Sequence, residues 1–191
     1  MDNTRTDIGT FHMASKPDLF ETQKSNAFKF IVTDLDPLTD PITGKVIPNA
    51  ADIIKESVAS FEPPSFSQSP IELRRGNMVC KAAGTPVFSN GSINIHNFVG
   101  LDVYRVFYAW QALSGSIKTG RNGLMKDYKK TAYLIEYTTD FSEIVRVWKL
   151  VGVWISGLKE GTYDNSTNAN EVPITCTIEY DWAEPEDPSS I

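Results

Sequence analysis

The last third of the chain contains the stretch that decides the fold, Ile144-Val-Arg-Val-Trp-Lys-Leu-Val-Gly-Val-Trp-Ile155, followed later by Val172-Pro-Ile-Thr-Cys-Thr-Ile-Glu-Tyr-Asp-Trp182. β-Branched and aromatic residues dominate both segments. The residues between them, 156–171, are rich in Gly, Asn, Asp and Ser. This composition predicts two long strands joined by a polar loop.

The second segment alternates between apolar and polar residues, so we expect one packed face and one solvated face. The apolar positions are Ile174, Cys176, Ile178, Tyr180 and Trp182. The first segment is apolar on both faces, which is typical of a strand that is covered on both sides. Because a chain of this length can hardly cover both sides of such a long sheet, we expect a neighbouring subunit to cover part of it.

The chain is acidic, and it is long enough for one domain. Its length of 191 residues, 41% of them apolar, allows one folded core. No apolar run reaches the roughly 20 residues of a membrane span, and the polar start lacks the plan of a signal peptide. We therefore expect folding in the cytosol, no membrane insertion by this chain, and buried thiols at Cys80 and Cys176. The net charge of −6 argues against a protein that grips the phosphates of duplex DNA.

One segment, residues 102–113, has the periodicity of an amphipathic helix. Asp102 suits the N-terminal cap, and the pair Ser114-Gly115 suits the C-terminal stop. We expect the helix to cover the outside of a sheet with its apolar stripe. The stripe consists of Val103, Val106, Phe107, Trp110 and Leu113.

The rest of the chain divides into short strands and irregular stretches. Three prolines and a glycine in residues 34–54 exclude a central strand or a helix interior there, and they predict a turn-rich insertion. Residues 65–91 predict a long loop, and a loop of that length in a compact domain is usually functional. The other predicted segments are a polar arm at 1–26, strands at 28–33, 55–61, 92–97 and 132–137, and a flexible acidic tail at 184–191.

These segments, in this order, resemble the tail tube proteins of contractile phage tails and related contractile injection systems. The resemblance covers about residues 16–183 and departs from the family at the N-terminal arm and the 34–54 insertion. It is carried by Lys16-Pro-Asp-Leu-Phe20, by Arg75-Gly76 with Gly84 and Phe88, by the helix with Trp110, by Asp127-Tyr-Lys-Lys130, and by Trp148-Lys-Leu-Val-Gly-Val-Trp154 with the closing Tyr180-Asp-Trp182.

The resemblance implies a mainly β fold, an antiparallel β-sandwich or barrel-like tube fold with one flanking α-helix. Residues 27–183 would form this single tail-tube domain, and its sheets would join those of other copies across a hexameric ring. Such joining would remove the exposed sheet edges that otherwise aggregate.

The resemblance also implies a function. The chain would be a structural subunit of a contractile phage tail tube, with hexameric rings stacked around a channel for DNA passage and surrounded by a sheath. Its partners would be further copies of itself, the tail sheath protein, and the baseplate tube-initiating and tail-terminating proteins. The tape measure protein and DNA would occupy the lumen without specific binding. The expected location is the virion tail, assembled in the host cytoplasm. The inner tube of a bacteriocin or a secretion-type injection system is an alternative.

Two groups of residues are candidates for these contacts. In tube proteins the long excursion before the helix stacks one ring on the next, which here assigns ring stacking to residues 65–91. The polar positions of two predicted strands would line the lumen, with no Lys or Arg among them. The ring-stacking candidates are Ile71, Arg74, Arg75, Met78 and Lys81, and the lumen-facing candidates are Ser92, Asn94, His96, Thr175, Thr177 and Glu179.

No motif for catalysis, a cofactor or a metal is present in the sequence, so we expect no enzyme. The stretch Gly115-Ser-Ile-Lys-Thr-Gly120 has the glycines of a phosphate loop but continues with Arg121-Asn122 instead of Lys-Ser/Thr. His96 has no Ser or Cys partner in a recognisable arrangement. A small-ligand-binding or hydrolytic β-barrel is the alternative from another class, supported only by the β content and scattered carboxylates.

Overall fold

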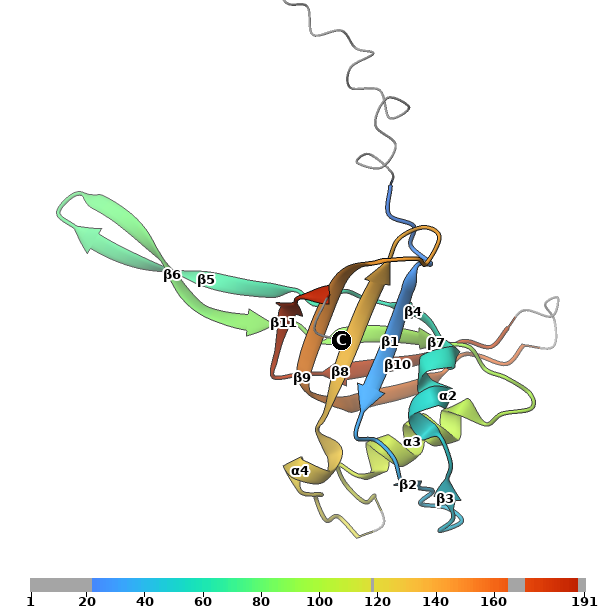
Figure 1. The fold of residues 1–191 in the computed structure, drawn as a ribbon. Helices are drawn as coiled ribbons and strands as arrows, with labels where there is room; N and C mark the ends of the chain where they lie inside the picture. The colour runs from blue at the N-terminus through green and yellow to red at the C-terminus, as the bar shows by residue number, and fades with distance from the viewer. Residues whose placement is uncertain (1–21, 118, 165–170, 189–191) are drawn as a thin grey trace, which may run out of the picture.

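Strand β9 (Ile144–Glu160) is the longest strand of the computed structural model, which describes residues 22–117, 119–164 and 171–188. It belongs to both layers of the fold, because β8 and β11 flank its first half and β10 flanks its second half. The strands of the two layers cross at a steep angle (Figure 1). The sheet order is β1 (Phe28–Thr33), β8 (Lys130–Tyr137), β9, β10 (Ile174–Glu179), β7 (Gly91–Ile95) and β4 (Val58–Phe61), with β11 (Trp182–Glu186) beside β9.

A bulge at Gly152 turns β9 from one layer to the other. Lys130 pairs with Val153 while Thr131 pairs with Val151, so Gly152 has no opposite residue, and its φ of +74° lies in the left-handed region. Before the bulge Leu150 is buried in the core, and after it Val153 and Ile155 are. The sequence places apolar residues on both faces of this strand partly because the strand turns its other face to the core after Gly152.

The expectation that a neighbouring subunit covers part of this sheet stays a prediction. Val147 lies on the face opposite Leu150 and is fully buried within the single chain, whereas Val145, two residues before it, is 46% exposed. The single chain therefore covers part of the second apolar face by itself.

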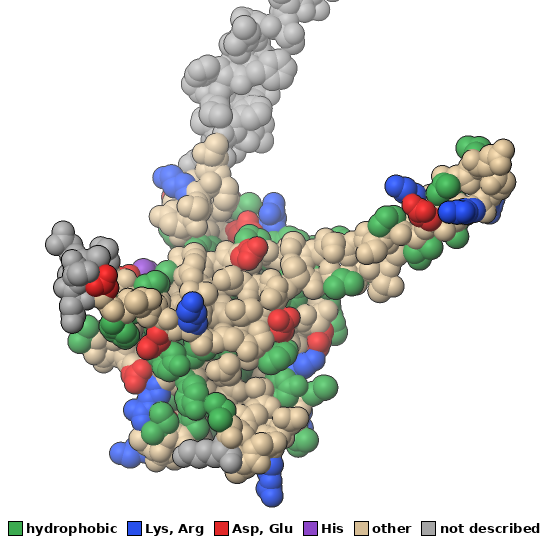
Figure 2. Space-filling view, turned by 180° about the vertical axis from the view of Figure 1, so that it is seen from behind, with side chains coloured by type: hydrophobic (Ala, Val, Ile, Leu, Met, Phe, Trp, Pro, Cys, Tyr) green, Lys and Arg blue, Asp and Glu red, His purple; other side chains and the backbone are tan. Residues whose placement is uncertain are grey.

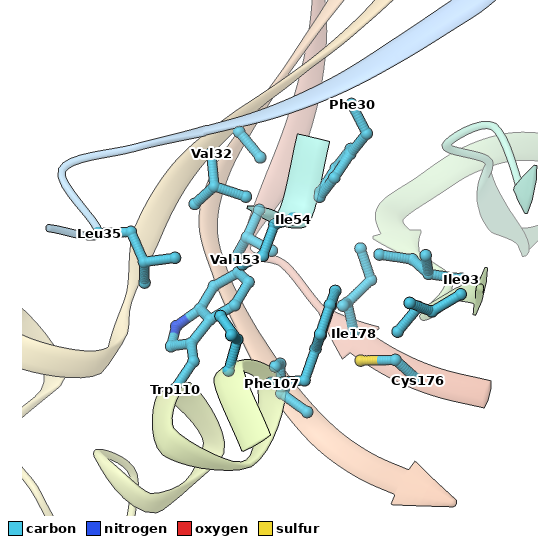
Figure 3. Packing of buried hydrophobic residues seen from close by; sticks show 14 of the residues in the cluster. Phe30, Val32, Leu35, Ile54, Ile93, Phe107, Trp110, Val153, Cys176 and Ile178 are labelled. Carbon is cyan, nitrogen blue, oxygen red and sulfur yellow. The ribbon is translucent and has the colours of Figure 1, made fainter. Parts of the chain in front are cut away.

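The core lies between the two layers and beneath two helices (Figure 3). Helix α3 (Val103–Ala112) packs on β9, and Asp102 caps it by accepting a hydrogen bond from the backbone N–H of Arg105 at 3.1 Å. Trp110 is 1% exposed, and its Nε1 donates to the carbonyl of Tyr128 at 3.0 Å. Four residues of the apolar stripe are buried and Leu113 is partly buried, so the packing and the polar cap confirm the predicted helix.

The predicted insertion and second strand differ from the structure at residues 50–57, which form helix α2 (Ala50–Ser57). The helix packs on β1, with Ala50, Ile54 and Ser57 buried. These residues recur at helical spacing, but the prolines before them concealed the signal. Pro48 precedes the helix rather than interrupting it. The rest of the insertion contains β2 (Leu38–Thr39) and β3 (Val46–Ile47), and a short helix, α4 (Met125–Tyr128), precedes β8.

The C-terminal end also differs from the prediction. The expected single strand at 172–182 is two strands, because the chain turns at Tyr180 and Asp181 and continues as β11 on the same edge of β9. Trp182 is consequently 46% exposed instead of packed. Residues 184–186 of the predicted flexible tail belong to β11, where Lys149 binds Glu186 at 2.6 Å.

Two expectations remain, one on the two ends of the chain and one on membrane insertion. Residues 1–21 of the predicted arm and residues 189–191 of the predicted tail lie outside the described residues. Among the helices that the structure describes, none has the length and apolar character needed to cross a membrane.

Candidate interaction surfaces

The predicted loop at 65–91 is an ordered β-hairpin. Strands β5 (Phe66–Arg75) and β6 (Met78–Phe88) pair along their length, and Gly76 makes the turn with a φ of +61°. The hairpin projects from the body as a long arm (Figure 1), and every residue of β5 is exposed. A two-stranded hairpin without a packed face is by itself at best marginally stable in water.

The structure places the five ring-stacking candidates together on the outer half of this arm. Ile71 and Met78 are 52% and 71% exposed, although both are large and apolar. Arg75 pairs with Met78 across the end of the hairpin, and Lys81 pairs with Glu72. Further exposed apolar side chains on the arm are Phe66, Leu73, Val79 and Val87.

The arm is basic, whereas the rest of the chain is acidic. Residues 66–88 contain three Lys and Arg against one Glu, and the other residues contain 15 Lys and Arg against 23 Asp and Glu. The basic side chains gather toward the end of the arm, as Figure 2 shows. A contact between the arm of one copy and the body of another would therefore join opposite charges.

The arm also carries a free cysteine that was expected to be buried. Cys80 lies on β6 and is exposed, because the arm is not covered by the rest of the chain. Cys176 is buried as expected, and its burial raises the pKa of the thiol to about 12. Cys176 is therefore an inert core residue.

The six lumen-facing candidates lie on one face of β7 and β10. Opposite residues in an antiparallel pair point to the same side, and Asn94 is opposite Thr175, as Ser92 is opposite Thr177. The other face of the two strands is the core, with Ile93, Ile95, Ile174, Cys176 and Ile178 all buried. The structure therefore brings these candidates together as one polar surface, which we name the polar face of β7 and β10.

Hydrogen bonds join the polar face across three strands. Asn94 donates through Nδ2 to Ser60 Oγ of β4 at 2.9 Å and accepts from Thr175 Oγ1 at 3.2 Å. His96 Nδ1 lies 2.9 Å from Glu171, a residue that the sequence reasoning missed. The hydrogen bond from His96 lowers the pKa of this carboxyl.

A lysine that the sequence reasoning did not consider lies beside the six lumen-facing candidates, none of which is Lys or Arg. Lys159 is exposed and pairs with Thr175, so it lies on the same side of the sheet. It was missed because residues 156–160 looked like the start of a polar loop, whereas β9 continues to Glu160. The alternation of Leu158, which packs against the core, with exposed Lys159 was the available signal.

Among the residues that the structure describes, no group of three His, Cys, Asp or Glu is placed to hold a metal ion. The polar face and the neighbouring Lys159 offer hydroxyl, amide, carboxylate and ammonium groups on the surface of the sheet. Such groups can hydrate a surface or contact a passing molecule.

Comparisons with known proteins identify the fold through solved structures and not through sequence. No model of a protein family matches the sequence, and no curated protein is similar to it in sequence. Among solved structures, a chain of the PVC sheath–tube complex, an extracellular contractile injection system in its extended state, matches with a TM-score of 0.62 at 16% identity. The match covers 92% of this chain and 98% of that chain.

Two further structures agree. A chain of the PVC sheath/tube terminator matches at a TM-score of 0.61 and 17% identity, over 87% of this chain and 97% of that chain. A chain of the anti-feeding prophage cap, which terminates the tube, matches at 0.60 and 16% identity, over 86% and 91%. The described chain therefore has the mainly antiparallel β fold of the tail tube proteins of contractile injection systems.

Proposed function

We propose that this chain is a structural, non-enzymatic subunit of a tail tube, and that its copies form rings stacked around a channel. The observation that carries the proposal is the projecting hairpin β5–β6, on a body with the tail tube fold. A subunit that acts alone has no use for an exposed apolar arm with a basic end. A stacked subunit can lay that arm on the acidic body of the next ring.

The polar face of β7 and β10 would line the channel. It lies on the side of its sheet opposite the core, and its side chains hydrate the surface without a concentrated positive charge. A strongly basic lining would bind nucleic acid by releasing counterions from each neutralised phosphate. This face carries Glu171 and Glu179 beside Lys159, so DNA or another linear cargo could pass without being held.

We extend the proposal to the particle as follows. The rings are hexameric, a sheath surrounds them, and baseplate and terminator proteins close the two ends. Tape measure protein and DNA occupy the lumen of a phage tail that assembles in the host cytoplasm and ends as part of the virion. The solved neighbours also include tubes of extracellular injection systems, which makes a bacteriocin or secretion-type tube the second candidate.

Removing the outer half of the hairpin tests the stacking role. Residues 71–82 are replaced by Asn-Gly, which leaves the pairs from Phe66–Phe88 to Pro70–Ala83 in place and closes them with a favourable two-residue turn. We expect folded subunits or single rings that do not elongate, seen by negative-stain electron microscopy. Tubes of normal length from this variant would contradict the stacking role.

A charge reversal separates electrostatics from shape. Arg74→Glu with Arg75→Glu keeps the hairpin length, and Lys45→Glu with Arg121→Glu is the matched control at exposed positions of the body. We expect the hairpin pair to shorten the tubes and the control pair to leave their length unchanged. Equal shortening by both pairs would mean that net charge alone, and not the hairpin, governs stacking.

A further inference from the structure

A groove of about 460 Å³ opens at one end of the core, where β1 begins and β8 ends (Figure 1). Its large apolar side chains come from both layers of the fold. They are Phe28 of β1, Leu134 of β8, Trp148 of β9 and Phe61 of β4. Phe61 stacks on the buried ring of Phe30, with 4.9 Å between the ring centroids, so the groove continues the core outward.

The walls of this groove are incompletely covered by the described residues. Phe28, Phe61 and Trp148 pack against the core but are only partly buried. The indole Nε1–H of Trp148 is buried and has no hydrogen-bond acceptor among the described residues, although most buried donors have one. Because protein cores are close-packed, these walls leave room for a further apolar segment at the end of the core.

One segment of this chain starts at the mouth of the groove. The described part of the chain begins at residue 22, and Gln23 and Lys24 already line the groove. Gln23 is anchored there, because its Nε2 donates a hydrogen bond to the carbonyl of Tyr137 at 2.6 Å. Residues 16–21, Lys-Pro-Asp-Leu-Phe-Glu, therefore join the body at the rim of the groove.

This segment has apolar side chains at the right distance from the groove. Leu19 and Phe20 precede Gln23 by four and three residues. An extended chain advances at most about 3.3–3.6 Å per residue, so both stay within roughly 15 Å of Gln23. The groove begins at Gln23 itself, which places its apolar walls within reach of both side chains.

The charges at the rim also match the segment. Lys24 is exposed, and Arg146 is 55% exposed with only one carboxylate, that of Glu136, at 3.6 Å. Asp18 comes directly before the apolar pair Leu19-Phe20. When the pair lies in the groove, the carboxylate of Asp18 can meet this basic rim.

We propose that Leu19 and Phe20 occupy the groove of their own chain and close this end of the core, with Asp18 at the basic rim. The short connection to Gln23 gives the pair a high effective concentration at its own groove, which favours this groove over that of another copy. The inference goes beyond the proposed tube function and does not depend on it, because it concerns a contact within one chain.

Hydroxyl-radical footprinting of the full-length wild-type protein tests this contact, with mass spectrometry measuring oxidation at each residue. Phe11 is the matched internal control for Phe20, because it is the same residue type earlier in the same N-terminal segment. If the docked state outweighs the open one by about four to one, about a fifth of the molecules are open, and Phe20 should be oxidised about fivefold more slowly than Phe11. Equal rates would overturn the proposal.

A pair of substitutions tests the same contact from the side of the groove. Leu19→Asp with Phe20→Asp should raise the oxidation rate of Trp148 about fivefold by the same arithmetic, whereas the control Phe11→Asp with Met13→Asp should leave it unchanged. Trp110, which is 1% exposed, stays protected as long as the core is folded. If the double substitution disrupts the core, Phe20→Ser replaces it. An unchanged rate at Trp148 in the folded variant would overturn the proposal.

A mixture of two proteins identifies which copy supplies the pair. The Leu19→Asp, Phe20→Asp variant is labelled with heavy nitrogen and mixed with an excess of unlabelled wild type, so that mass separates the two. We expect Trp148 of the labelled copies to stay reactive, because each wild-type segment closes its own groove. Protection of the labelled copies would overturn the assignment to the same chain. Tube formation is scored separately by electron microscopy, so these outcomes leave the proposed function to its own tests.

Discussion

At the scale of single residues, Gly152 determines where β9 changes layers. Its left-handed φ disfavours any side chain, and an added Cβ would overlap the carboxylate of Asp181, which Lys129 holds at 2.7 and 2.9 Å. We expect Gly152→Ala to lower the free energy of unfolding by about 1–3 kcal/mol, measured by urea denaturation. Gly157→Ala is the matched control, because its Cβ would make an ordinary 3.5 Å contact with Thr177. Equal effects of the two substitutions would contradict the role of Gly152.

Asp140 gives a pH-dependent prediction in the turn between β8 and β9. Hydrogen bonds from Thr138 and Ser142 lower the pKa of its carboxyl from 3.8 to about 2. Because the pKa is lower in the folded chain, the ionised carboxylate stabilises the fold above pH 4, and this contribution is lost as pH falls toward 2. Asp140→Ala should therefore unfold more easily than wild type at pH 7, with a difference that shrinks below pH 4. A difference that is constant from pH 7 to pH 2.5 would rule out the carboxylate as its source.

At the scale of elements, the polar face of β7 and β10 predicts how the channel treats nucleic acid. Thr177→Lys with Glu179→Lys adds positive charge on side chains outside the core, so rings and tubes should still form. We expect these tubes to retain DNA in low salt, to release it steeply as salt rises, and to slow genome ejection in a reconstituted particle. Asp52→Lys with Glu56→Lys on the exposed side of α2 is the control. DNA retention equal to the control would show that the polar face does not line the channel.

The elements also show how far the sequence alone could reach. Strand β1 and the helix with Trp110 were predictable because their patterns are local: a short apolar run, and a stripe at helical spacing with a cap. The course of β9 could not be predicted in the same way. Gly152 inverts the alternation in the middle of the strand, and Lys159 pairs with Thr175, a residue of a later strand. The sequence shows that the five ring-stacking candidates share one excursion, but the hairpin form of this excursion depends on pairs such as Glu72 with Lys81 that no local periodicity marks.

At the scale of the whole molecule, two features support the proposed assembly. The body has a tail tube fold, and a basic arm leaves an otherwise acidic chain. The first feature defines the fold, and the second would supply the surface for the proposed contact between rings. Screening by salt should weaken that contact, because it depends on charge.

The most direct test of the tube is electron microscopy of the purified full-length wild-type protein, continued to a helical reconstruction. We predict hollow tubes of stacked rings, with Asn94 and Thr175 facing the channel and the β5–β6 hairpin of each copy lying on the next ring. Dispersed monomers at all concentrations, or tubes whose channel is lined by another face, would contradict this account.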